Sequence, residues 1–157
     1  MSLHSIRIAT LGAVLGTMFL VAGAAADDNE FELAVWTIRA TKSNSDISPE
    51  LKPIAKELKE RYKFTGFKLE KQTTAKKKEG EAYAVDLIGG YKVKLTPTAR
   101  DGNRVKLQLE LSKKEGDKEK KLTSTSFTIT KGKFQLVGGG KIDEKSGDEL
   151  IVAVSGR

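Results

Sequence analysis

The stretch YAVDLIGGYKVKLTPTARDGNRVKLQLEL, from Tyr83 to Leu111, decides the fold. Apolar and polar residues alternate in each of its three runs, as expected of β-strands with one buried face. Breaks at Gly89-Gly90 and Gly102 separate the runs and predict two hairpins. We therefore expect three consecutive antiparallel strands that share a single apolar side.

The charged residues allow the register of the first hairpin to be tested. If Ile88-Gly89-Gly90 is a three-residue loop with Gly90 in the left-handed conformation, Val85 lies opposite Val93 and Asp86 lies opposite Lys92. A two-residue Gly-Gly turn would instead place Asp86 against Val93. The first register satisfies both faces of the sheet, so it is the one we predict.

The second hairpin is predicted by the same argument. With Asp101-Gly102-Asn103 as its loop, Lys94 lies opposite Glu110 on the outer face. The same register opposes Arg100 and Arg104 at the mouth of the turn, at a small energetic cost.

Strand patterns continue on both sides of this stretch, and one helix interrupts them. Phe31–Ala40 reads as the first strand, and Phe134–Val137 as a short strand that Gly138 ends. Between Leu111 and Phe134 we expect a charged turn at Lys113–Lys121 and then a strand rich in serine and threonine at Leu122–Thr130. Leu150–Val154 is apolar on both faces, so it should be central or covered on both sides. The helix is expected from Ser48 to Lys63, with its apolar stripe formed by Leu51, Ile54, Ala55, Leu58 and Tyr62.

These elements predict an α+β fold that is mostly β. We expect an antiparallel meander of about seven to eight strands, with one N-terminal amphipathic helix packed on it. The pattern allows three arrangements, a half-open sheet, a sandwich or a partial barrel, of which we favour the half-open sheet covered by the helix.

The N-terminus predicts export. Residues 1–26 combine a basic start at Arg7, an apolar run from Ile8 to Ala22 and small residues at Ala24–Ala26, which is typical of a cleaved signal peptide. Residues 27–157 would then form a single domain with no membrane span. We expect it to be soluble in the periplasm or outside the cell, and not a lipoprotein, since no cysteine follows the cleavage site.

Composition excludes most catalytic chemistry. The chain has no cysteine, and its one histidine, His4, lies in the leader. Thiolate or imidazole nucleophile systems and zinc sites are therefore excluded from the domain. Carboxylate pairs remain, but acids such as Glu79, Glu115 and Asp117 fall in lysine-rich turns. We therefore expect no enzyme activity, no cofactor and no metal.

The candidate binding and structural residues follow from charge and from glycine. The chain carries a net charge of +7, and Lys92, Lys94, Arg104 and Lys106 project from one face of adjoining strands. Such a face favours an anionic partner. Nucleic acid is not expected, because the aromatic residues fall on the core side of the strands. The structural glycines are Gly90, Gly102, Gly138, Gly139 and Gly140, which allow bends or close backbone approach.

The final third of the chain resembles bacterial secretins. The resemblance lies in the Thr123–Ile129 run, the turn at Lys131-Gly132-Lys133, the run Phe134–Gly139 and the closing run Leu150–Val154. It implies a shared β-hairpin pattern and a role beside envelope export machinery, without channel formation. Residues 27–157 also resemble small exported bacterial β-rich proteins of unknown function, with a helix of the form SPELKPIAKELKERYKF before the strands.

The leading prediction is a non-catalytic exported module that binds an envelope protein or an anionic polymer, with sheet edges available for strand addition. Two alternatives remain. One is a carboxylate-dependent enzyme acting on envelope glycans, which would need two facing carboxyl groups about 5–10 Å apart. The other is a purely structural envelope protein. The sequence predicts no oligomeric state.

Overall fold

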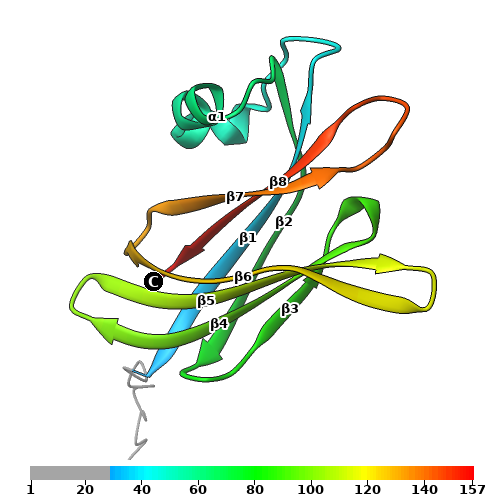
Figure 1. Cartoon of the computed structure of the whole chain (residues 1–157). Helices are drawn as coiled ribbons and strands as arrows, with labels where there is room; N and C mark the ends of the chain where they lie inside the picture. Colours follow the sequence, from blue (N-terminus) through cyan, green and yellow to red (C-terminus); the bar gives the residue numbers. More distant parts are fainter. Residues whose placement is uncertain (1–28) are drawn as a thin grey trace, which may run out of the picture.

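The computed structural model describes residues 29–157, so the predicted signal peptide lies outside the described part. Eight strands form two four-stranded antiparallel sheets, which we call sheet A (order β2-β1-β8-β7) and sheet B (order β3-β4-β5-β6) (Figure 1). No helix among these residues is long and apolar enough to cross a membrane. The strands are β1 (Glu30–Thr41), β2 (Gly66–Lys78), β3 (Tyr83–Asp86), β4 (Tyr91–Asp101), β5 (Arg104–Glu115), β6 (Lys118–Thr130), β7 (Phe134–Lys141) and β8 (Glu149–Gly156).

The first and last strands occupy the centre of sheet A. β8 pairs with β1 on one side and with β7 on the other, and its residues Leu150–Val154 are at most 1% exposed. One face of β8 packs against sheet B, and the other packs under the helical segment. The prediction that this doubly apolar run is central is confirmed. The pairing of β1 with β8 also means that the strands do not form the simple meander that we expected.

The helical segment covers the outer face of sheet A. Leu51, Ile54 and Leu58 are buried there in a cluster with Trp36, whose ring lies 4.4 Å from that of Phe134 between centroids. The segment follows β1 and divides into a 3-10 helix, η1 (Pro49–Ile54), and a short α-helix, α1 (Ala55–Arg61). The expectation of one N-terminal amphipathic α-helix is therefore wrong. Two prolines in η1 each lack an N–H donor, which agrees with the late start of the α-helix.

Sheet B contains the stretch that decides the fold. In the first hairpin Val85 lies opposite Val93 and Asp86 lies opposite Lys92, as predicted. The connection is a 3-10 turn, η2 (Ile88–Gly90), in which Gly89 and Gly90 have φ values of 73° and 78°. Both values lie in the left-handed region that glycine adopts readily, so the predicted loop is confirmed.

The second hairpin confirms the register in its middle and corrects the turn. Lys94 lies opposite Glu110, but at the turn Arg100 lies opposite Val105 and Asp101 opposite Arg104. The predicted clash of Arg100 with Arg104 is therefore wrong. The turn is one residue shorter than expected, and a bulge between Pro97 and Ala99 restores the register. A bulge suits this position, since proline has no N–H for the ladder.

The two sheets enclose the main core. Side chains of alternating residues from β1, β8, β4 and β5 form it, including Val93 and Leu109, both fully buried. The hydroxyl of Tyr91 in β4 donates a 2.8 Å hydrogen bond to the Lys141 carbonyl in β7, which ties the sheets together. The described residues form a sandwich of two sheets without a closed barrel, so the half-open sheet that we favoured is not the arrangement observed.

Two element boundaries differ from the expectation. β7 runs through Gly138–Gly140 to Lys141 rather than ending at Val137, and the glycines form a bulge in it. The charged segment Lys113–Lys121 is mostly strand, with a tight turn between Glu115 and Lys118. Gly140 has a φ of 105°, and a Cβ there would lie 3.1 Å from the Tyr91 hydroxyl. Gly140 therefore allows close approach of β7 to Tyr91 of sheet B.

Candidate functional site

Each sheet has two edge strands, and these edges are the first place to look for a binding site. An edge strand presents unpaired N–H and C=O groups, which can pair with another chain. Sheet A ends at β2 and β7, and sheet B ends at β3 and β6. Natural proteins protect such edges with lysines, bulges, short strands or covering segments.

Three of the four edges carry such protection. β2 contains five lysines among its 13 residues. β3 has only four residues. β7 is interrupted by the bulge between Gly138 and Gly140. These three edges are therefore poor templates for a long additional strand.

The edge of β6 lacks protection over much of its length. β6 has 13 residues and includes the uncharged run Leu122–Thr130, which contains neither proline nor glycine. Residues 122–126 are exposed, and Leu122, at 40%, is a large apolar side chain left in solvent. Its paired partner β5 is buried on its inner face, so β6 is held firmly on one side and open on the other.

The hydrogen-bond pattern identifies which backbone groups face the open side. The Lys131 N–H donates to the Asn103 carbonyl at 2.6 Å, which makes Arg104 and Thr130 a non-hydrogen-bonded pair. Pair types alternate along an antiparallel ladder, and the register is regular back to Thr123. The N–H and C=O groups that point away from β5 therefore belong to the residues of even number, Ser124, Ser126 and Thr128, together with the N–H of Thr130. The Thr130 carbonyl instead accepts from Lys133 in the turn.

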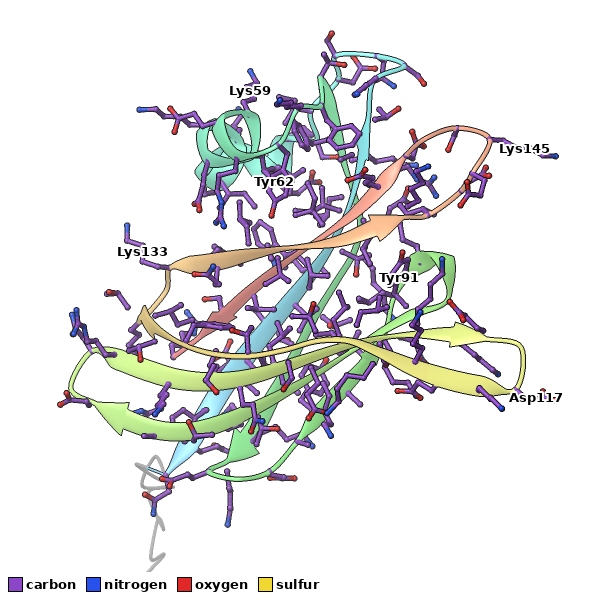
Figure 2. All side chains as sticks on the ribbon, in the orientation of Figure 1. Lys59, Tyr62, Tyr91, Asp117, Lys133 and Lys145 are labelled. Carbon is purple, nitrogen blue, oxygen red and sulfur yellow. The ribbon has the colours of Figure 1, made fainter. Side chains whose placement is uncertain are left out.

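Basic residues flank this open edge at both ends. Figure 2 shows Asp117 at the tip of the β5–β6 hairpin and Lys133 at the turn into β7, at opposite ends of β6. The hairpin end includes Lys118 and Lys120, and the other end includes Lys131 and Lys133, all exposed. None of these four lysines forms an ion pair with another described residue. The acids Glu115 and Asp117 lie at the hairpin tip itself.

The predicted basic face lies on the outer side of sheet B, but half of it is neutralised. Lys94 Nζ lies 2.8 Å from Glu110, whose carboxylate also binds Lys121 at 3.0 Å. Lys92 Nζ lies 3.4 Å from Glu119. Hydrogen bonds from the lysines lower the pKa of Glu110, so it is ionised at neutral pH. These lysines are therefore largely committed to internal pairs.

Arg104 and Lys106 form a separate group at the other end of the same face. They line a shallow hollow with Ala99, Asp101 and Thr128, and both are exposed. The uncharged cross-strand pair Thr96 and Gln108 lies between them and the Lys94 group. The structure therefore brings the four predicted basic residues onto one face in two groups rather than in one continuous patch.

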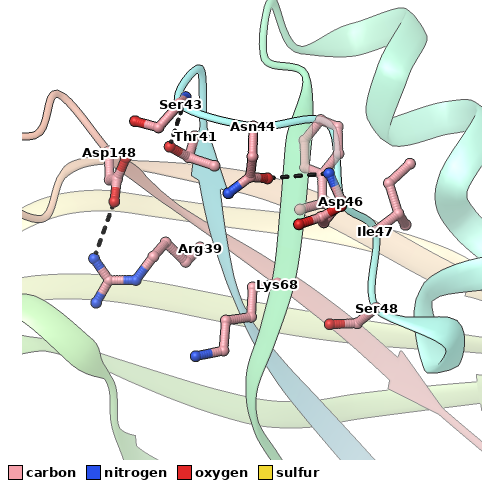
Figure 3. Close-up of a pocket in the computed structure, with 10 residues that line it drawn as sticks. Arg39, Thr41, Ser43, Asn44, Asp46, Ile47, Ser48, Lys68 and Asp148 are labelled. Carbon is pink, nitrogen blue, oxygen red and sulfur yellow. Dashed lines mark hydrogen bonds and ion pairs between the residues drawn. The ribbon is translucent and has the colours of Figure 1, made fainter.

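A polar pocket of about 390 Å³ lies at the end of sheet A, beneath residues 41–48 (Figure 3). Arg39 from β1 is its central cation, with Nε 2.8 Å from Glu70 and Nη1 3.2 Å from Asp148. The pKa of Asp148 is lowered, most by the nearby Thr41 hydroxyl and then by Arg39. The buried Oδ1 of Asp148 nevertheless has no hydrogen-bond partner of good geometry among the described residues. Two carboxylates thus converge on one guanidinium.

This convergence is unsuited to general acid catalysis. A glycosidase needs one carboxyl group whose pKa is raised, so that it can donate a proton near neutral pH. Wherever a carboxyl group of the described residues has a shifted pKa, the shift is downward, because hydrogen-bonding and charged partners stabilise the carboxylate: Glu32, Glu81, Glu110, Glu119 and Asp148. The pocket acids Glu70 and Asp148 serve to hold the Arg39 guanidinium.

The sequence interpretation did not identify β6 as the open edge. It assigned Leu122–Thr130 to a strand but gave no order of strands, so the edges could not be named. The sequence feature that could have indicated an open edge is the long serine- and threonine-rich run between lysine-rich turns. It differs from β2, which has five lysines among its 13 residues. The Arg39 ion pairs were also missed, because their partners lie 31 and 109 residues away in sequence.

No protein-family model matches the chain, and no curated protein sequence matches it either. Among solved structures, it is similar to the secretin-domain β-barrel of InvG from the Salmonella injectisome, with 11% identity, a TM-score of 0.33 and coverage of 82% of this chain. It is likewise similar to the type II secretion secretin XcpQ from Pseudomonas aeruginosa, with 10% identity, a TM-score of 0.33 and coverage of 81%. The chain spans 62% and 57% of those two chains. The resemblance to secretins seen in the sequence thus recurs in the structures, and at this TM-score it carries no conclusion about function.

Proposed function

We propose that this protein is an exported, non-catalytic binding module that captures an extended segment of a partner protein on the edge of β6. The observation that carries the proposal is the contrast among the four sheet edges. Three are blunted by lysines, shortness or a glycine bulge, whereas β6 offers an uncharged edge from Leu122 to Thr130. An unprotected edge of this length invites aggregation unless it has a use.

The backbone chemistry supports strand addition. Ser124, Ser126 and Thr128 each present an N–H and a C=O to the open side, and they match the backbone groups of an incoming strand. In strand addition the main-chain hydrogen bonds supply affinity, and the side chains on alternate positions supply specificity. β6 is anchored along its other side to β5, so little ordering cost falls on the module itself.

A pair of substitutions at Ser126 tests the proposal. Ser126→Pro removes an N–H that faces the open side and leaves every β5–β6 hydrogen bond in place, which proline tolerates on edge strands. Ser126→Ala changes the same exposed side chain and keeps the N–H. Both proteins would be immobilised, exposed to an envelope extract of the source organism, and the bound proteins identified.

The proposal predicts at least one protein that Ser126→Ala retains and Ser126→Pro loses. On adding that purified protein, the amides of Ser124, Ser126 and Thr128 should become protected from hydrogen exchange. Identical captured sets for the two variants, with equal thermal stability, would refute it.

The predicted basic face supports a second candidate, binding of an anionic polymer. Arg104 and Lys106 are exposed and form no ion pair with another described residue, unlike Lys92 and Lys94. Retention on a heparin column and its salt dependence would test this function. We expect Arg104→Ala/Lys106→Ala to elute at lower salt than the wild type, whereas unchanged elution would exclude this face.

A further inference from the structure

The lysines at the two ends of β6 indicate what kind of segment the edge accepts. We infer that the preferred partner segment is uncharged in its middle and acidic at both ends; this inference rests on the proposed function. Lys118 and Lys120 lie at one end of the edge and Lys131 and Lys133 at the other, with only Ser, Thr, Leu, Phe and Ile between Leu122 and Thr130. A strand lying along β6 would place its own ends beside these ammonium groups.

The same charges disfavour a second copy as the occupant. Two copies of β6 could pair in antiparallel fashion about Ser126, because Ser124, Ser126 and Thr128 form a self-complementary set. In that arrangement the lysines at the start of β6 in one copy approach Lys131 and Lys133 of the other. Like charges placed opposite each other destabilise a sheet pairing, so the flanking lysines act against self-association.

The local acids do not cancel this selectivity. Glu119 accepts a 2.6 Å hydrogen bond from the Ser112 hydroxyl of β5 and lies 3.4 Å from Lys92 of β4. Its carboxylate therefore lies over the neighbouring strands of sheet B and not at the open edge. Glu115 lies opposite Lys118 and Asp117 lies in the turn just before it, whereas Lys120 lies opposite Lys113, so Lys120 is the flanking lysine at this end that faces no acid across the ladder. At the other end no acid is present from residue 131 to residue 141, and the nearby Asp101 of the β4–β5 turn lies opposite Arg104. Both ends of the edge therefore favour carboxylates in an incoming strand.

The inference can be tested with three labelled peptides that share an alternating Thr-Val middle and end in Glu, Gln or Lys. Fluorescence anisotropy with the purified protein would measure their affinities at low salt. We expect the Glu-ended peptide to bind on the order of tenfold more tightly than the Lys-ended one, with the Gln-ended peptide between them. The difference should shrink at about 1 M salt, where charges are screened beyond roughly 3 Å.

Charge-reversal variants separate the flanking lysines from net charge. Lys131→Glu/Lys133→Glu should remove or invert the preference, since it reverses the charge at one end of the edge without touching its N–H groups. The matched control is Lys59→Glu/Lys145→Glu, which makes the same change in net charge at two exposed sites far from β6 (Figure 2). This control should retain the preference.

The outcomes distinguish the two proposals. If the three peptides bind equally and Ser126→Pro abolishes their binding, the charge inference is wrong and strand addition stands. If no peptide binds, or binding survives Ser126→Pro, the proposed function fails and this inference fails with it. A dimer in sedimentation that dissociates in Ser126→Pro would show that a second copy occupies the edge, which also overturns the inference.

Discussion

Lys94 and Glu110 face each other across β4 and β5, with Nζ 2.8 Å from Oε2. The same carboxylate binds Lys121 of β6 at 3.0 Å, so one acid links three neighbouring strands of sheet B. Hydrogen bonds from Lys94 and then Lys121 lower the pKa of Glu110 below its ordinary value of 4.5. This link makes the stability of the sheet depend on pH.

Glu110→Gln should flatten the acid side of the stability curve. A lowered folded-state pKa contributes stability that is fully present above the unfolded pKa and is lost as pH falls through the folded pKa. Urea unfolding should therefore show the wild type more stable than Glu110→Gln at about pH 7, and the two should converge as the pH falls through the lowered pKa of Glu110. Because the Glu110 carboxylate is partly accessible to solvent, salt should shrink the difference. Glu115→Gln, at the hairpin tip, is the control and should follow the wild type; a constant gap at every pH would contradict the argument.

The cross-strand pairs were predictable because two independent requirements had to agree. Val93 against Leu111 and Lys94 against Glu110 satisfy the inner and outer faces in a single register. The turn at Gly102 was not predictable, since a shorter turn and a bulge after Pro97 together produce the same register further along. The order of strands was also out of reach. Nothing in the sequence of β1 states that it pairs with β8, a contact between the two ends of the domain.

The candidate site likewise has features that the sequence predicts and features that only the assembled sheet shows. The exposed positions of Lys92, Lys94, Arg104 and Lys106 follow from strand parity, which the sequence supplies. The Lys94 partner Glu110 lies in β5 and follows from the predicted register, whereas the Lys92 partner Glu119 comes from β6, whose place beside β5 only the structure gives. An edge is a property of the assembled sheet, so the open side of β6 could be named only from the structure.

Leu109→Ala should test the core of the sandwich. Leu109 is fully buried among side chains of both sheets, and truncation to alanine leaves a cavity. We expect a loss of about 2–5 kcal/mol in the free energy of unfolding. The matched substitution Leu122→Ala, at a residue that is 40% exposed, should cost less than about 0.5 kcal/mol. Chemical denaturation of both variants measures the difference, and similar losses would place Leu109 outside the core.

Gly139→Ala should destabilise the protein although its neighbour Gly138→Ala does not. A Cβ at Gly139 would lie 2.8 Å from Leu150 Cδ2 and 3.0 Å from its Cγ, and Leu150 is fully buried and unable to move aside. The resulting overpacking should cost about 1–3 kcal/mol. At Gly138 the nearest atom, Tyr62 Cε1, lies at an ordinary 3.4 Å. Thermal melts of the two variants check the contrast, and equal melting temperatures would refute the bulge geometry.

Hydrogen exchange of the free protein should show an alternating pattern along β6. The amides of Thr125, Phe127 and Ile129 lie in hydrogen-bonded pairs with β5 and should be protected. Those of Ser124, Ser126 and Thr128 point away from β5 and should exchange rapidly, because no described residue accepts from them. Amide-resolved exchange by NMR at low protein concentration measures both sets in one experiment. Uniform protection along the strand would mean that the edge is already occupied, by β7 or by a second copy, and would remove the basis for strand addition. Uniform rapid exchange would instead mean that β6 does not hold to β5, and no template for a partner strand would exist.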